Sequence, residues 1–558
     1  MSRIAGLLIQ WTSQWTRWSV RHWHLVLLAL AAAGMFMAQC ILAGDAKIDD
    51  AFITFSFSKN LALGHGPIYS HGVRVEGYST FLWMVLVALP LVITRGAAPL
   101  GMARVMAAPF VVLLGWSVYR LARSCGASRT VAAICVLFLS FNTDLAVAYL
   151  TGMETLPFVA LVTFAFAAAV RSFSEPRWTK WAAWGGLGVA LMRIDGFVPC
   201  GAMLGYLFLR VLVKGDAKAI RGFFRTFGPP IVVYTIWFLW RWHYYGLFLP
   251  STYYAKALLP KLMPQRGQGY LIDEVMEGWL WGGLVGWLWL LWRRQLGAAL
   301  IGCYVIIHWM YVITVGGDWM PFGRFVLPTI PLLIALLGAA GSDLVLGSFR
   351  SRSRIRWLVP FVPFALSAMM AVRMDHRFLN SDFEKSKLAG VSEQTSNVDN
   401  YLRASEFLRE VVPPGGRLVT DYGGIFAYYT DAAVIEMWGL ANAMIATRGN
   451  TEGVQPFYGR TCAACYPELQ PEYFHVMQPL VRREQAFSST SQVIANVWQT
   501  EAIGRYIDFE ATFAVGRALL PQTGEALYFL QKRDRAFSPV RRTTQRGFVI
   551  DYPFEAAL

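Results

Sequence analysis

The chain has 558 residues, of which 56% are hydrophobic, 15% aromatic and only 15% charged. This composition excludes an ordinary soluble enzyme, in which about 25% of the residues are charged. The formal net charge of +15 does not indicate a nucleic-acid partner, because the Lys and Arg residues stand in short clusters between apolar runs, as membrane topology requires.

Apolar runs of the length that a membrane crossing needs recur along the chain. Because a helix spans the hydrocarbon with about 20 apolar residues, the pattern predicts a mainly α-helical, polytopic membrane bundle of about eleven spans. Residues 81–93 form a shorter run that contains Pro90, and there we expect a helix lying in the membrane interface. The predicted spans start near Leu25, Gly101, Thr130, Leu156, Trp181, Gly196, Gly228, Tyr270, Leu296, Arg324 and Trp357.

The basic clusters predict the orientation. With a cytoplasmic N-terminus, each dense cluster falls on the cytoplasmic side, as the positive-inside rule requires. The first span is longer than the apolar core of a signal peptide, so we expect it to remain as an anchor of a multi-pass protein in a bacterial inner membrane. The clusters are Arg120, Arg123 and Arg129; Arg171, Arg177 and Lys180; Arg210, Lys214, Lys218, Arg221 and Arg225; Arg293 and Arg294; and Arg350, Arg352, Arg354 and Arg356.

The first outer loop, residues 44–100, carries an acidic pair, Asp49 and Asp50, at the start of a predicted surface helix. A carboxylate at the membrane edge is suited to accept the proton of an attacking hydroxyl, while a helix N-cap is the structural alternative for either aspartate. His65 stands between two glycines, where we expect a turn or a sugar contact rather than a metal ligand. Glu76 either binds acceptor hydroxyls or forms a salt bridge with Arg74.

Three cations, Arg193, Lys256 and Arg324, lie near span ends on the outer side. Arg makes bidentate contacts with phosphate and Lys acts as a point charge, so these residues are candidates for holding an anionic lipid headgroup. Pairing of Arg193 with Asp195 and of Arg324 with Asp318 is the alternative. Asp318 itself has three candidate roles: holding a cation, orienting Arg324, or shaping a turn after two glycines.

Residues 374–558 form the second predicted domain, after a transmembrane domain over residues 1–373. Polar stretches alternate there with β-rich runs at 417–421, 433–437 and 526–532, which predicts a soluble α/β domain on the periplasmic side. Cys462 and Cys465 have no further zinc ligands nearby in the sequence. A local disulfide is therefore preferred to a redox role.

Several blocks of this sequence resemble the GT-C glycosyltransferases, in particular the branch that contains the mycobacterial terminal arabinofuranosyltransferase. The most specific are DDAFITFSFSKNLALGHGPIYSHGVRVEGYSTFLW in the first outer loop and GGDWMPFGRFVLP at residues 316–328. Four more are spread over the rest of the chain. They are GMET at 152–155, RIDG at 193–196, YYGLFLPSTYYAK at 244–256 and DYGGIFAYYTDAAVIEMWGL at 421–440.

The resemblance implies a polyprenyl-phosphate sugar donor, an aspartate base at Asp49 or Asp50, and a periplasmic C-terminal domain. It implies transfer of a sugar, with arabinofuranose as the suggested one, to an exported glycan, lipid or protein of the cell envelope. A lysine where relatives have an arginine in the first loop, and Ser251 in place of an asparagine, leave the sugar and the acceptor open. The residues expected to contact substrate are Glu76, Glu154, Asp318, His65, Tyr253 and Tyr254.

Two further matters stay open at this point. A transporter or flippase of lipid-linked sugars shares the donor, although it requires neither an acidic base nor a large outer domain. The sequence names no certain cofactor, and a divalent cation is the one left for consideration.

Overall fold

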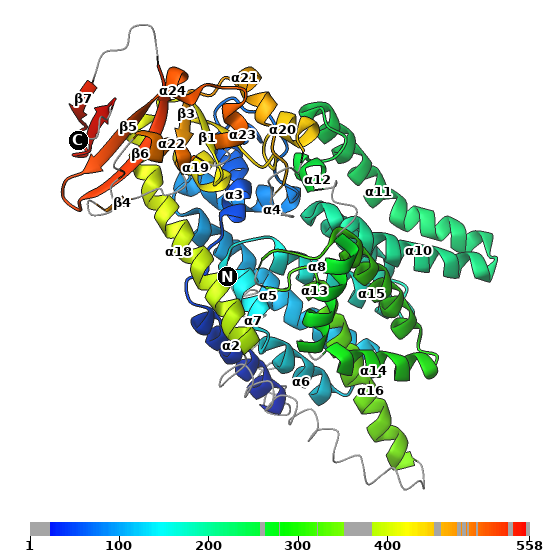
Figure 1. Cartoon of the computed structure of the whole chain (residues 1–558). Helices are drawn as coiled ribbons and strands as arrows, with labels where there is room; N and C mark the ends of the chain where they lie inside the picture. The colour runs from blue at the N-terminus through cyan, green and yellow to red at the C-terminus, as the bar shows by residue number, and fades with distance from the viewer. Residues whose placement is uncertain are drawn as a thin grey trace, which may run out of the picture.

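The computed structural model describes residues 23–256, 263–277, 280–320, 322–350, 382–450, 459–476, 481–482, 487, 490–497, 500–533 and 540–553. Helices make up most of it, and a β-sheet stands at one end of the helical part (Figure 1). The predicted span near Trp357, the basic residues Arg352, Arg354 and Arg356, and the predicted domain boundary after residue 373 lie outside the described residues.

Every predicted span inside the described ranges corresponds to at least one helix, and the predicted helical membrane fold is confirmed. The helices are α2 (Trp23–Ala43), α5 (Pro99–Ser124), α6 (Arg129–Ser140), α7 (Thr143–Leu150), α8 (Thr155–Arg171), α9 (Trp178–Met192), α10 (Phe197–Lys214), α11 (Ala217–Tyr245), α13 (Met263–Glu277), α14 (Leu280–Trp292), α15 (Leu296–Val315) and α16 (Ile330–Arg350).

The predicted number of eleven spans is not confirmed. Within the described ranges, five helices are long and apolar enough to cross a membrane, and the bent pair α6 and α7, which meet at 62°, makes a sixth. The bend falls at Asn142, whose side chain accepts a hydrogen bond from the backbone of Leu145 at 2.9 Å and so starts a new helix. The run predicted from Tyr270 as one span belongs to two helices, α13 and α14.

Small residues let the helices approach closely, as in other membrane bundles. A Cβ added at Gly283 of α14 would lie 2.7 Å from Cβ of Leu333 in α16, and one added at Gly286 would lie 2.9 Å from Cα of Leu337. Any larger side chain at either position would therefore force α14 and α16 apart.

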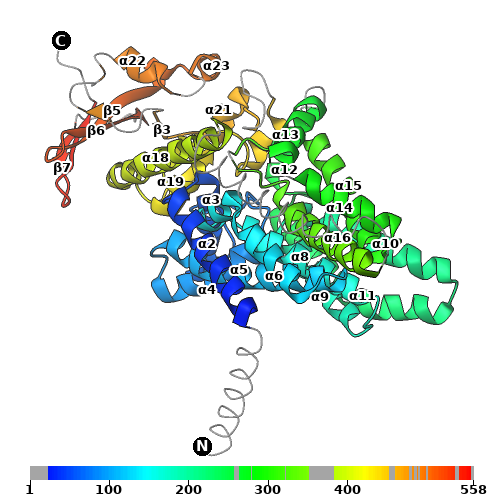
Figure 2. The ribbon, with the colours of Figure 1, turned by 90° about the horizontal axis from the view of Figure 1, so that it is seen from below.

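The first outer loop contains α3 (Asp49–Ala62) and α4 (Phe81–Thr94), the latter with Pro90 inside, as expected of the short run. The prediction that α3 is a surface helix is wrong, because its residues from Ala51 to Ser58 are all buried. Its covering comes from α4 and from α19 (Gly423–Tyr429), which lies beside α3 in both views (Figures 1 and 2). Lys59 fixes this packing by donating a 2.6 Å hydrogen bond to the carbonyl of Tyr428.

The C-terminal part begins with α18 (Asp382–Val411) and contains an eight-stranded sheet of order β2-β1-β3-β6-β5-β8-β7, with β4 paired to β6. Strands β1, β2 and β3 are parallel, and the other pairs are antiparallel. All three predicted β-rich runs are strands. The strands are β1 (Arg417–Thr420), β2 (Ala433–Glu436), β3 (Tyr473–His475), β4 (Val481–Arg482), β5 (Phe513–Leu520), β6 (Glu525–Lys532), β7 (Val540–Thr543) and β8 (Val549–Tyr552).

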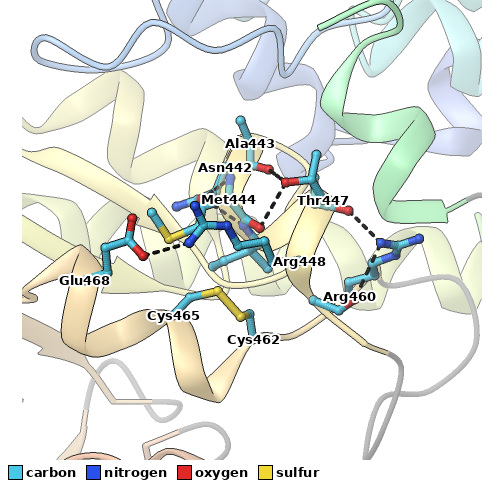
Figure 3. Close-up of a disulfide and its surroundings, with 12 residues drawn as sticks. Asn442, Ala443, Met444, Thr447, Arg448, Arg460, Cys462, Cys465 and Glu468 are labelled. Atoms are coloured by element: carbon cyan, nitrogen blue, oxygen red, sulfur yellow. Dashed lines mark hydrogen bonds and ion pairs between the residues drawn. A yellow bond between two sulfur atoms is a disulfide. The ribbon is translucent and has the colours of Figure 1, made fainter.

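Short helices flank the sheet, and the predicted disulfide lies among them. They are α20 (Ala443–Arg448), α21 (Tyr466–Leu469), α22 (Thr490–Ala495), α23 (Thr500–Gly504) and α24 (Phe509–Thr512). Cys462 and Cys465 are bonded, with their Cα atoms 5.3 Å apart, just before α21 (Figure 3). Nearby, Arg448 pairs with Glu468 at 2.7 Å and joins α20 to α21.

Candidate active site

Acidic and basic side chains from four distant segments meet where the first outer loop touches the sheet. The parallel strands β1, β2 and β3 have their carboxyl ends at one edge, the position at which open α/β sheets usually bind ligands. Asp421 follows β1, Glu436 ends β2 and His475 ends β3. The N-terminus of α3, with Asp49 and Asp50, faces this edge through its contact with α19.

Asp49 caps α19 from across the interface. Its Oδ1 accepts a hydrogen bond from the backbone N–H of Ile425 at 2.8 Å, and its Oδ2 accepts one from Gly424 at 3.2 Å. A Cβ at Gly424 would lie 2.3 Å from the Asp49 carbonyl oxygen, so only glycine permits this approach. One alternative from the sequence was that Asp49 caps a helix. Asp49 does cap a helix, but the helix is α19 of the C-terminal part.

Burial raises the pKa of Asp49 to about 8, and the neighbouring charges of Asp50 and Asp421 act in the same direction. The two backbone N–H groups from α19 oppose this shift. Asp49 is therefore engaged in holding two segments together, which distinguishes it from the aspartate that follows.

Asp50 has no hydrogen-bond or ion-pair partner among the residues that the structure describes, and its side chain is half-buried. Its charge acts on Lys256 and on Glu436, which places all three in one neighbourhood. A carboxylate without a protein partner remains able to accept a proton from a bound hydroxyl.

Lys256 ends α12 (Ser251–Lys256) and is the matching cation. It too lacks a hydrogen-bond or ion-pair partner within the described ranges, and burial lowers its pKa although Asp50 opposes the shift. The start of α12 is fixed by Ser251, whose hydroxyl lies 2.7 Å from the carbonyl oxygen of Glu76 and 2.9 Å from that of Leu440. Lys256 is thereby positioned from the first loop and from the sheet domain together.

Glu436 is a site residue that sequence reasoning missed. It is buried, and its two oxygens accept hydrogen bonds from the backbone of Trp438 at 2.7 Å and of Ala441 at 3.1 Å. Burial raises its pKa to about 7, and the Asp50 charge adds to the shift. The available signal was an acid directly after the apolar run A-V-I in a block already singled out, because such a run ends at the ligand-binding edge if it is a parallel strand.

Arg324 pairs with Asp318, as one alternative predicted. Nη2 of Arg324 donates to Oδ1 of Asp318 at 3.1 Å, and Nε pairs with Oδ2, so the contact is bidentate. Both residues are buried after the turn at Gly316 and Gly317, which have φ of 83° and 74°. Their charges act on Lys256, so this pair borders the same neighbourhood.

Arg193 is saturated by two carboxylates. It donates to Asp195 at 2.8 and 3.0 Å and to Glu154 at 2.8 Å, and all three residues are buried. The rings of Phe158 and Phe325 lie 5.4 and 5.6 Å from its guanidinium carbon. A further anion would have to displace a carboxylate, so a structural part in bringing α8, α9 and α10 together explains Arg193 and Glu154 well.

Glu76 is buried against Arg241 of α11. The alternative prediction, a salt bridge between Glu76 and Arg74, is wrong. Arg241, itself fully buried, donates from Nε to both carboxylate oxygens, at 3.0 and 2.9 Å, and from Nη2 to one of them. Arg74 instead stacks on the ring of Tyr244 at 4.8 Å. The carboxylate of Glu76 has no free face for an acceptor hydroxyl in this arrangement.

His65 does not belong to this neighbourhood. It is exposed and follows the C-terminal end of α3, a 14-residue helix about 21 Å long whose other end carries Asp49 and Asp50. Tyr253 is 53% exposed and Tyr254 half-buried on α12, with their rings in edge contact at 5.8 Å. Both tyrosines stay within one helical turn of Lys256 and remain candidates for substrate contact.

No group of three or more His, Cys, Asp or Glu side chains in the described ranges is arranged to hold a metal ion. Asp318, the residue considered for a cation, is occupied by Arg324. The divalent cation thus stays an untested expectation.

Known proteins are similar to this chain in part. A family model described as "Domain of unknown function (DUF8728)" matches residues 389–522. The terminal beta-(1->2)-arabinofuranosyltransferase of Corynebacterium glutamicum is 25% identical over 363 residues, which are 55% of this chain and 50% of that protein. The chain therefore spans half the length of the curated relative that it matches.

Among solved structures, the archaeal oligosaccharyltransferase AglB from Archaeoglobus fulgidus, in complex with an inhibitory peptide and a dolichol-phosphate, has a similar fold. The TM-score is 0.52 at 12% identity, over 93% of this chain and 75% of that chain. ArnT from Cupriavidus metallidurans bound to undecaprenyl phosphate gives a TM-score of 0.49 at 12% identity, over 95% and 97% of the two chains. The expected GT-C-like fold and the expected resemblance to terminal arabinofuranosyltransferases are confirmed.

Proposed function

We propose that this protein is a membrane glycosyltransferase that transfers a sugar from a polyprenyl-phosphate donor to an acceptor on the outer face of the membrane. The observation that carries the proposal is the pair formed by Asp50 and Lys256, two opposite charges in one neighbourhood without hydrogen-bond or ion-pair partners in the described ranges. Because no ion pair joins them, substrate groups can occupy both without first breaking a protein contact.

In the proposed reaction Asp50 is the general base. It accepts the proton of the acceptor hydroxyl, whose oxygen bonds to the anomeric carbon while the bond to the phosphate oxygen breaks. Lys256 lies beside the leaving phosphate and stabilises its charge, an effect that is stronger in a partly buried site than in water. Arg324 and Arg193 contribute through the field of their ion-paired clusters rather than through free guanidinium groups.

The donor lipid also needs a place for its chain. An apolar cavity of about 250 Å³ lies between α9, α10 and α11 and is lined by Phe197, four residues after Arg193. The wall is formed almost wholly by apolar side chains, which suits a prenyl chain. Dolichol-phosphate in the structurally similar AglB supports a lipid phosphate of this class.

The curated relative supports arabinofuranose as the transferred sugar. The acceptor in this proposal is an exported glycan, lipid or protein. We further propose a bacterial inner-membrane location, with the N-terminus in the cytoplasm and the sheet domain in the periplasm, on the distribution of basic residues. No observation favours a transporter or flippase, whereas the sheet domain placed over α3 is explained by acceptor transfer.

The test is transfer from a labelled polyprenyl-phosphate sugar by the purified full-length protein. Asp50→Asn should lower the rate about 10²–10⁴-fold, the usual contribution of a general base, and Lys256→Gln should lower it as well. The matched control is Asp45→Asn on the same loop, an exposed aspartate paired with Lys47 and Arg104, which should keep the rate.

Unchanged turnover in Asp50→Asn would remove the proposed base. The same labelled lipid in proteoliposomes separates the alternative, because translocation of intact donor without release of sugar would overturn the transferase assignment.

A further inference from the structure

A cavity lined by charged side chains lies far from the candidate active site. It has a volume of about 520 Å³, and four arginines line it: Arg120, Arg123, Arg129 and Arg171. Tyr119, Ser124 and Ser174 complete the wall and add hydroxyl groups. The proposed transfer reaction uses none of these residues.

The cavity lies at the opposite ends of the helices that reach the candidate active site. α5 begins after Gly96, which accepts a hydrogen bond from Tyr428 of the sheet domain, and runs for 26 residues, about 39 Å, to Ser124. α8 begins after Glu154, the partner of Arg193, and ends at Arg171. With the predicted orientation, the cavity therefore opens on the cytoplasmic side.

Aromatic rings hold two of the arginines in place. The guanidinium carbon of Arg120 lies 5.7 Å from the ring centre of Trp116 and 5.5 Å from that of Trp178, and Arg171 lies 5.1 Å from the same Trp178 ring. The buried Nε atoms of both arginines donate to no acceptor in the described part of the chain. Two like charges are thus fixed against one ring with donor capacity to spare.

Glu175 is an acidic residue beside the cavity, and it balances only part of the positive charge there. Glu175 pairs with Arg171 at 2.6 Å and with Arg177 at 2.9 Å, and its second oxygen also accepts from Trp178. Arg120 has no ion-pair partner among the described residues. The positive-inside rule explains why basic residues are on this side, but it does not require that they converge on a cavity.

We propose that this cavity binds the phosphate group of an anionic phospholipid in the cytoplasmic leaflet of the membrane. Guanidinium groups match phosphate oxygens in bidentate geometry, and basic hollows between transmembrane helices on the cytoplasmic side are suited to such headgroups. The position at the ends of α5 and α8 lets the acyl chains of a bound lipid stay in the bilayer. Free inorganic phosphate shares the chemistry and is the second source to be distinguished.

The experiment uses the purified full-length protein in nanodiscs of phosphatidylcholine with or without phosphatidylglycerol. Native mass spectrometry measures the phosphatidylglycerol retained, and thermal unfolding in detergent with added inorganic phosphate is the second arm. Arg120→Gln, Arg171→Gln and the double variant are compared with Arg225→Gln, which removes an exposed arginine of α11 that does not line the cavity.

Phosphatidylglycerol should be retained by the wild type and by Arg225→Gln, and each cavity variant should retain it about tenfold less tightly, with the double variant weaker still. Stabilisation by inorganic phosphate alone, lost in the same variants, would support the site with the free anion as its ligand. Equal retention in cavity and control variants would overturn the proposal, as would a wild type that neither retains phosphatidylglycerol nor responds to phosphate. The wild-type arms keep the test decisive if a variant does not fold.

Discussion

Two charged regions at opposite ends of α5 and α8 differ in how their arginines are paired with carboxylates. Beside the sheet domain, Arg193, Arg241 and Arg324 are each buried against one or two carboxylates. Around the cavity at the far end, Glu175 pairs with Arg171, whereas Arg120 has no ion-pair partner among the described residues. A charge that is removed from water needs an opposite charge inside the protein, whereas a charge beside an open cavity can be balanced by a bound anion.

The largest effect should come from breaking a buried pair beside the sheet domain. Arg241→Gln leaves the carboxylate of Glu76 buried without its cation, which should lower the free energy of unfolding by about 3–5 kcal/mol. Thermal and denaturant unfolding of the purified protein measure the loss. Adding Glu76→Gln to the same chain should restore part of it, and a loss below about 1 kcal/mol would contradict the assignment.

A smaller loss is expected at the cap between the domains. Above about pH 8, where Asp49 is ionised, Asp49→Asn keeps one acceptor oxygen but turns an amide donor toward a backbone N–H of α19, which should destabilise the protein by about 1–3 kcal/mol. Limited proteolysis should then cleave the chain at α3 or at α19 more readily, because the contact between the two helices is weakened. Asp45→Asn is the control, since its exposed pairs contribute at most about 1 kcal/mol.

The pH dependence of stability tests the same interface. Burial raises the pKa of Glu436 from 4.5 to about 7, so between these values the folded protein holds a proton that the unfolded chain has released. Stability from this group is complete below pH 4.5 and is lost as the pH rises to about 7, with a slope of at most about 1.4 kcal/mol per pH unit. Glu436→Gln should flatten unfolding curves over this range, and an unchanged slope would show that other groups set it.

The smallest effect should come from the far cavity. In detergent without phosphate or anionic lipid, Arg120→Gln should lower the free energy of unfolding by no more than about 1 kcal/mol, because the contacts of Arg120 with the rings of Trp116 and Trp178 are lost but no ion pair is lost and repulsion from Arg171 is relieved. Unfolding of Arg225→Gln, measured alongside, gives the baseline for removing one exposed charge. A loss as large as that of Arg241→Gln would mean that the two regions do not differ.

Sequence reasoning predicted the parts of the fold that depend on local pattern. Apolar runs gave the helices, β-rich runs gave β1, β2 and β6, and the acidic pair marked the start of α3. Where a partner lay far along the chain, the pattern held no information. Nothing in the sequence near Glu76 points to Arg241, and nothing near Asp49 points to the backbone of residues 424–425.

The candidate site shows the same division. Asp50 and Lys256 were identified by charge, position and motif, and the pairing of Arg324 with Asp318 was foreseen because the two are six residues apart. His65 lies in a turn, as one of its two alternatives predicted, and α3 separates it from the acidic pair. Glu436 was overlooked because its importance arises only when β2 is known to be parallel to β1.

The junction at Ser251 has a consequence for biosynthesis. Its hydroxyl meets the carbonyl of Leu440, and Asp49 meets the backbone of Gly424 and Ile425. A nascent chain that already contains the described membrane helices still lacks these contacts until the segment up to residue 440 has been synthesised. Truncated translation products therefore cannot arrange Asp50 and Lys256 as the full-length chain does, so the candidate site is assembled only after most of the chain has been made.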